Sequence, residues 1–98
     1  MTLEQRHIVK SALREYGLRR WANSAERRLW RESIDEALAY YDRTDPIRSE
    51  LVRLRYIQKR TEEQTIDQLH IGRTTYKKAH DDLLSTIAVY AAQRGVLR

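Results

Sequence analysis

The scarcity of residues that bend the chain constrains this sequence most. Its 98 residues include only three Gly and one Pro. A β-sandwich or barrel needs a turn about every ten residues, and turns depend on Gly and Pro for their backbone geometry. The sequence therefore predicts an all-α fold, interrupted only at Gly17, Asp45–Pro46, Gly72 and Gly95.

Length and the lack of cysteine set further limits. A chain of 98 residues is one domain's worth of material. Without Cys it can form no disulfide, thiolate metal site or thiol nucleophile. No apolar run approaches the roughly 18 residues of a membrane span, and the first residues lack the apolar segment of a signal peptide. We therefore expect a single helical domain, 1–98, in the cytoplasm and not at a membrane.

Apolar residues recur at spacings of three and four in five segments, which is the period of one helix face. Helix starts are marked by Thr2, by Asn23 or Ser24, and by Asp45–Pro46. The sequence TEEQ at 61–64 is a capping box. We expect an N-terminal helical pair in residues 1–44 and a second module in 45–98, with helices over Thr2–Tyr16, Asn23–Asp42, a segment opening at Asp45–Pro46, Thr61–Leu69 and Arg73–Gln93.

The second module has the layout of a helix-turn-helix. A capped short helix precedes a three-residue turn, His70–Gly72, and a longer helix with a basic start. Leu69 and Ile71 are expected to hold the turn in the core, with Tyr76 facing back onto the short helix. The polar side chains at the start of the long helix then point outward, and this end of such a motif enters the major groove of DNA.

This layout predicts which residues contact DNA. Base-edge contacts are expected from Arg73, Thr74 and Lys77, while Arg and Lys contacts to phosphate supply affinity and register. The N-terminus of the short helix lies over the backbone, where its amides point at phosphate. The acidic pair Asp81–Asp82 is expected to confine contact to the first two turns. The candidate DNA-binding residues are Thr61, Gln64, Arg73, Thr74, Thr75, Lys77 and Lys78.

The overall charge agrees with such a ligand. The chain carries 19 basic against 14 acidic side chains, a net charge of +5, and 15 of the basic residues are Arg. Arginine forms forked hydrogen bonds with phosphate, and a small basic domain attracts polyanions.

Five motifs between Pro46 and Tyr90 resemble a known module. They are LRYI at 54–57, TEEQ at 61–64, LHIGR at 69–73, Thr75–Tyr76 and Leu83–Leu84. These motifs are similar to the helix-turn-helix of region four of bacterial sigma factors, and more so to the small phage late-gene regulators of the ArpU and RinA type. The resemblance implies a sigma-like module in a bacterial cell, double-stranded DNA as the ligand and control of transcription in a phage or mobile element. It also implies RNA polymerase or a phage protein as a further partner.

Four positions depart from the pattern of that family. Thr65 stands where Ile or Val is usual, and Ile66 takes a slot usually held by Ala. His70 replaces a Gly before the turn, and Gly72 replaces a Ser N-cap. The first two departures suggest a small rotation of the short helix, and Gly72 caps only a few tenths of a kcal/mol less well than Ser.

Other interpretations stay open. The same layout occurs in plain helical bundles, where Arg73, Lys77 and Lys78 would form a solvated face. The alternative function is that of a small terminase-like DNA-packaging protein or a helical adaptor that binds protein through residues 21–41. The pairs Arg19–Arg20 and Arg27–Arg28 can reach phosphates or pair with acidic residues of their own helices.

No enzyme signal is found in the sequence. The three His have no spacing suited to a metal, and Gly72–Thr75 does not fit a phosphate-binding P-loop. We expect no catalytic residue, metal or cofactor.

The last predicted helix carries a second apolar row, Leu84, Ala88 and Ala91. One row suffices to pack a recognition helix on its own domain, so the second needs another cover. Either the N-terminal helices or a second chain can supply it, and the sequence slightly favours a two-fold homodimer.

Overall fold

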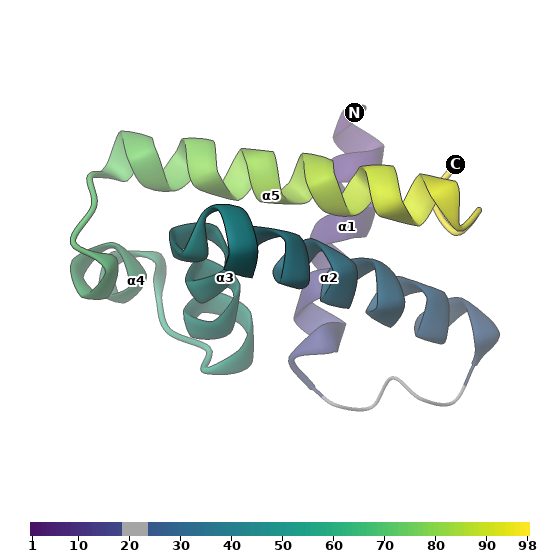
Figure 1. Cartoon of the computed structure of the whole chain (residues 1–98), viewed down its shortest axis with the longest axis horizontal. Helices are drawn as coiled ribbons and strands as arrows, with labels where there is room; N and C mark the ends of the chain where they lie inside the picture. The colour runs from purple at the N-terminus through teal and green to yellow at the C-terminus, as the bar shows by residue number, and fades with distance from the viewer. Residues whose placement is uncertain (19–23) are drawn as a thin grey trace.

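The computed structural model describes residues 1–18 and 24–98, and it is helical throughout these ranges, with no strand (Figure 1). The all-α prediction is confirmed. The predictions for Arg19–Arg20 and Asn23 lie outside the described residues. In chain order the elements are α1 (Leu3–Tyr16), α2 (Ala25–Thr44), α3 (Pro46–Val52), the π-helical turn η2 (Arg53–Ile57), α4 (Glu62–Leu69) and α5 (Arg73–Gln93).

Local capping explains where the first two helices begin. The Thr2 hydroxyl accepts a hydrogen bond from the Gln5 amide at 3.0 Å, and the Gln5 side chain accepts one from the Thr2 amide at 2.8 Å. This reciprocal pair is a capping box. The Ser24 hydroxyl accepts from the Arg27 amide at 3.1 Å and starts α2 in the same way.

The start of α3 differs from the prediction in one respect. Pro46 occupies the first turn as expected, but the Asp45 side chain makes no capping hydrogen bond. Its carboxylate pairs with Arg48 instead. A side-chain cap accepts from the second or third amide of a helix, so Pro46 at the first position does not prevent it, and the ion pair with Arg48 is what occupies the carboxylate.

The segment after α3 continues as the π-turn η2, which the apolar periodicity did not predict. The turn closes where the Gln58 amide donates to the Arg53 carbonyl at 2.8 Å. A π-turn inserts one residue per turn and so shifts the side chains that follow, and such turns are frequent at functional sites.

The main core joins α1, α2, η2 and the second half of α5. Figure 1 shows α5 along the long dimension of the molecule, with α2 and α3 beside it and α1 crossing it. Its largest fully buried side chains come from α1, α2 and α5 and are Leu13, Ile34, Leu83, Leu84 and Ile87.

The second apolar row of α5 is covered within the chain. Leu84 and Ala91 are fully buried in the main core, where residues of α1 and α2 pack against them. The row therefore needs no second chain, which corrects the reason for favouring a dimer. The homodimer itself stays a prediction.

A smaller cluster holds α4 against the start of α5. Leu51, Tyr76 and Ala79 are buried there, and Leu69 and Ile71 pack against them. This cluster fixes the turn before α5.

Gly17 ends α1 for a different reason than a left-handed turn. Its φ is −70°, a value open to any residue. A Cβ atom at this position would lie 2.0 Å from the carbonyl oxygen of Tyr56. Glycine is needed because the end of α1 touches the backbone of η2.

None of the helices in the described part of the chain has an apolar stretch that could span a bilayer.

Candidate nucleic-acid interface

The predicted capping box at Thr61 is confirmed. The Thr61 hydroxyl accepts from the Gln64 amide at 3.1 Å, and the Gln64 side-chain oxygen accepts from the Thr61 amide at 3.0 Å. Both side chains are exposed, but these atoms are occupied in starting α4. A phosphate at this end of α4 can therefore bind chiefly to the backbone amides that remain free.

The structure shows how two of the four departing positions, Thr65 and His70, are accommodated. Thr65 is fully buried, and its hydroxyl donates to the Thr61 carbonyl at 2.9 Å, so a threonine is satisfied at an apolar position. His70 lies in the left-handed region, with φ 55° and ψ 44°. That conformation costs a residue other than Gly roughly 1–2 kcal/mol, so the packing of the turn holds it in place.

The first two turns of α5 present the polar face that the sequence predicted. Tyr76 and Ala79 are buried toward α4. The exposed side chains of these two turns are Arg73, Thr74, Thr75, Lys77 and Lys78.

Arg73 is engaged rather than free. Its guanidinium donates to Glu62 at 3.3 Å and lies 3.8 Å from a carboxylate oxygen of Glu63. In contrast, Lys77 and Lys78 have no carboxylate partner in the described part of the chain. The carboxylates of α4 therefore compete with DNA for Arg73.

A second basic surface adjoins this face, and the sequence analysis missed it. We call it the basic groove. It encloses about 580 Å³ between α1, η2 and α5. Its basic side chains are Arg6, Lys10, Arg14, Arg55, Lys59 and Lys77, and its acidic ones are Glu62 and Asp81.

One signal for the groove was available in the sequence. Arg6, Lys10 and Arg14 are spaced by four residues, so they lie on successive turns of one face of α1. The opposite wall, with Arg55 and Lys59, is placed there only by the packing of η2 against α1.

Most of the positive charge in the groove is not neutralised. Arg6 forms an ion pair with Asp81 at 2.6 Å. The other five cations of the groove have no carboxylate partner among the described residues, and 19–23 contain no acidic residue. The Arg55 Nε is buried without a hydrogen-bond partner in the described structure.

The floor of the groove holds three nearly parallel rings. The ring of His80 neighbours those of Tyr56 and Tyr76, with centroids 6.0 Å and 5.9 Å away. The Tyr56 hydroxyl and the His80 Nε2 are 2.6 Å apart. Burial, together with the nearby charges of Lys10 and Arg6, lowers the pKa of His80 to about 4, so this floor is uncharged at neutral pH.

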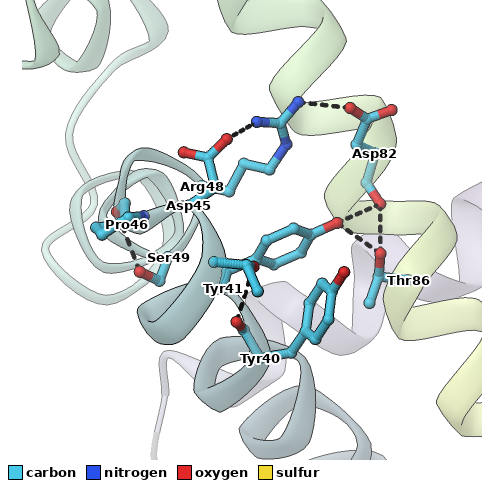
Figure 2. A network of polar contacts seen from close by, with 9 residues as sticks. Tyr40, Tyr41, Asp45, Pro46, Arg48, Ser49, Asp82 and Thr86 are labelled. Atoms are coloured by element: carbon cyan, nitrogen blue, oxygen red, sulfur yellow. Dashed lines mark hydrogen bonds and ion pairs between the residues drawn. The ribbon is translucent and has the colours of Figure 1, made fainter.

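The opposite side of α5 carries a polar seam, formed by Tyr41, Asp45, Arg48, Asp82 and Thr86. Figure 2 shows the Arg48 guanidinium between the carboxylates of Asp45 and Asp82, and it lies 2.6 Å from Asp82. The Tyr41 hydroxyl is 2.6 Å from the Thr86 hydroxyl. The seam joins α2, α3 and α5 with its charges paired.

The acidic pair on α5 is thus divided between two partners. Asp81 pairs with Arg6, and Asp82 pairs with Arg48. Both carboxylates are compensated, which weakens the repulsion of phosphate that we expected beyond the second turn of α5.

The pair Arg27–Arg28 is exposed on α2 and does not pair with acidic residues in the described structure. Glu32, four residues after Arg28 on the same helix, lies 3.7 Å from the Arg94 guanidinium instead.

Two adjoining surfaces thus hold the unpaired positive charge near α5: its exposed start and the basic groove, which share Lys77. Within the described residues no cluster of three or more His, Asp or Glu side chains could hold a metal. Comparisons with models of known families, with curated proteins and with solved structures find no match to this chain.

Proposed function

We propose that this chain is a sequence-specific DNA-binding protein that regulates transcription in a phage or mobile element. The observation that carries the proposal is the exposed polar start of α5, with Tyr76 and Ala79 buried beneath it and α4 braced alongside. In this proposal α4, the turn and α5 act as a helix-turn-helix, with α5 in the major groove. The phage origin and the regulatory role derive from the resemblance to the ArpU and RinA type.

The residues divide by role. Thr74 and Lys77 reach base edges, while Lys78 and the free amides of α4 contact phosphates. Arg73 leaves Glu62 and Glu63 when a guanine offers it two acceptors, an exchange worth about 1–3 kcal/mol of discrimination. RNA polymerase or a phage protein is the proposed second partner.

The test begins with selection of duplexes from a random pool by the wild-type protein. Binding of the selected duplex and of a scrambled one is then measured for Thr74→Ala and Lys77→Ala. We expect Thr74→Ala to lose preference at one position, and Lys77→Ala to cost about 1–3 kcal/mol. Arg28→Ala, an exposed change on α2, serves as the control.

Failure to enrich any sequence would contradict the proposal. Sedimentation of the protein with and without the duplex adds a second criterion. A two-fold complex would imply half-sites about 34 Å apart or a multiple of that spacing. A large ring without DNA affinity would favour the packaging or adaptor alternative.

A further inference from the structure

We propose that the basic groove binds the phosphate backbone of the same duplex that receives α5, an inference that rests on the proposed DNA-binding function. It makes α1 a second DNA-binding element. The phosphate ligands are Arg6, Lys10, Arg14, Arg55 and Lys59, none of which belongs to the helix-turn-helix.

The first argument is the uncompensated charge. Elsewhere in the described structure, arginines that join helices meet carboxylates, as Arg48 meets Asp82 and Arg53 meets Asp42. In the groove, folding brings like charges together and pairs only Arg6. Concentrated charge of one sign repels itself and attracts an anion of opposite sign, so a polyanion in the groove offsets that repulsion.

The second argument is the shape of the cationic row. Three side chains on successive turns of α1 span about 12 Å at a rise of about 1.5 Å per residue. One strand of a duplex presents a phosphate about every 3.4 Å along its axis. A row of this length can follow several phosphates of a strand, whereas a single free phosphate would use one or two of its cations.

The third argument is continuity. Lys77 lines the groove and also belongs to the exposed start of α5. A duplex held by α5 therefore has backbone within reach of the groove. Of the two carboxylates of the groove, Asp81 is paired with Arg6 and opposes phosphate less than a free carboxylate would, whereas Glu62 loses Arg73 when α5 binds DNA and then opposes phosphate.

The experiment measures duplex binding by fluorescence anisotropy over a series of salt concentrations. The probe is a mixed-sequence duplex of about three helical turns, about 30 bp. In Lys10→Gln/Arg14→Gln, the slope of log K against log salt should fall by about 2, because each phosphate contact contributes about 0.9. The loss should be the same for selected and scrambled sequences.

The matched control removes the same charge elsewhere. Arg27→Gln/Arg28→Gln changes two exposed cations at the N-terminal end of α2, which lies away from the start of α5 (Figure 1), and should leave the slope unchanged. Gln is a good helix former, so both double variants should keep their helices, which circular dichroism checks. If the control lowers the slope as much as the groove variant does, net charge explains the effect and the inference is wrong.

A second measurement separates the two sources of phosphate. Amide shifts of α1 are followed by NMR during titration with the duplex and with inorganic phosphate. Shifts with the duplex alone support the inference. Saturation by sub-millimolar inorganic phosphate, with no response to the duplex, would make the groove a small-anion site and overturn it.

The outcomes also distinguish phosphate binding by the basic groove from base recognition by the exposed start of α5. If the wild type binds no duplex, both proposals fail. If Thr74→Ala loses sequence preference while the groove variant keeps the wild-type slope, the proposed function stands and the groove inference fails. If the groove variant loses slope while Thr74→Ala and Lys77→Ala change nothing, the groove binds phosphate and α5 does not read bases.

Discussion

The two sides of α5 differ in whether their positive charges are paired with carboxylates. On the polar seam, Arg48 lies between Asp45 and Asp82 and ties three helices together. In the basic groove, Lys10 and Arg14 lie on one face of α1 with no carboxylate partner among the described residues. A paired arginine contributes to the fold, whereas an unpaired one leaves its charge available to a ligand.

The boundary between the two sides runs between adjacent residues. Asp81 and Asp82 diverge by about 100° on the helix. One therefore reaches the groove and the other reaches the seam. The comparison predicts that changes on the seam alter stability, and that changes of groove cations alter DNA binding.

The largest expected effect comes from the close contact between the end of α1 and η2. Gly17→Ala should lower the free energy of unfolding by about 3 kcal/mol, because the added Cβ would overlap the Tyr56 carbonyl oxygen, and such overpacking costs about 1–3 kcal/mol. Urea denaturation measures it. Relief of the overlap would separate α1 from η2 and weaken duplex binding as well.

Gly72→Ser is the control for that change. A Cβ at Gly72 meets nothing within 4 Å, and Ser caps α5 slightly better than Gly. We expect a gain of a few tenths of a kcal/mol. Equal losses at both glycines would remove the close contact at Gly17 as the explanation.

The next largest effect is a loss of stability at low pH, caused by the uncharged ring of His80 at the floor of the groove. The pKa of His80 is lowered to about 4 from an ordinary value of 6.5, so the unfolded chain binds a proton between these pH values and the folded chain does not. Stability is therefore fully present above pH 6.5 and falls as the pH drops toward 4. The contribution is on the order of 2–3 kcal/mol.

Denaturation at a series of pH values measures this loss, and His80→Gln should flatten the curve across that window. His7→Gln, an exposed change on α1, should leave it as in the wild type. A His80→Gln protein that retained the full pH dependence would show that carboxylates alone cause it.

A smaller loss is expected on the seam. Arg48→Gln removes a mostly buried guanidinium and leaves half-exposed Asp82 without its partner, which should cost about 1–2 kcal/mol. Its slope of duplex affinity against salt should match that of the wild type. A reduced slope with unchanged stability would show that Arg48 binds DNA and does not stabilise the fold, which would contradict the comparison between the two sides.

The smallest change in stability is expected at Glu62, which pairs with Arg73 at the exposed start of α5. Glu62→Gln removes an exposed carboxylate that pairs with Arg73, so stability should shift by less than about 0.5 kcal/mol. Duplex affinity should rise about two- to fivefold, the equivalent of one exposed ion pair. Asp67→Gln on the same helix is the control, and tighter binding by it as well would indicate a general effect of charge.

Local patterns predicted most of the fold. The start of α4 follows from Thr61 and Gln64, and α5 spans the predicted Arg73–Gln93. These features depend on contacts within four residues, which the sequence displays directly. The π-turn after α3 was not predictable in this way, because it depends on what the segment packs against. The cap at Asp45 is unused because its carboxylate pairs with Arg48, which Asp82 of α5 also binds.

The candidate site divides along the same line. The exposed start of α5 could be predicted, since helix periodicity separates Tyr76 from Lys77 and Lys78. The pairing of Arg73 with Glu62 could not, because it joins residues of two helices across a turn.

By itself the sequence determined the helices, their caps and the outward face of α5, because short-range periodicity decides these. Only the tertiary structure decided which cations are neutralised by carboxylates of other helices. Asp82 finds Arg48 on α3, and Asp81 finds Arg6 on α1, over distances in sequence that no local pattern spans. The basic groove exists because helix packing brings α1, η2 and α5 together there and supplies too few carboxylates to match their cations.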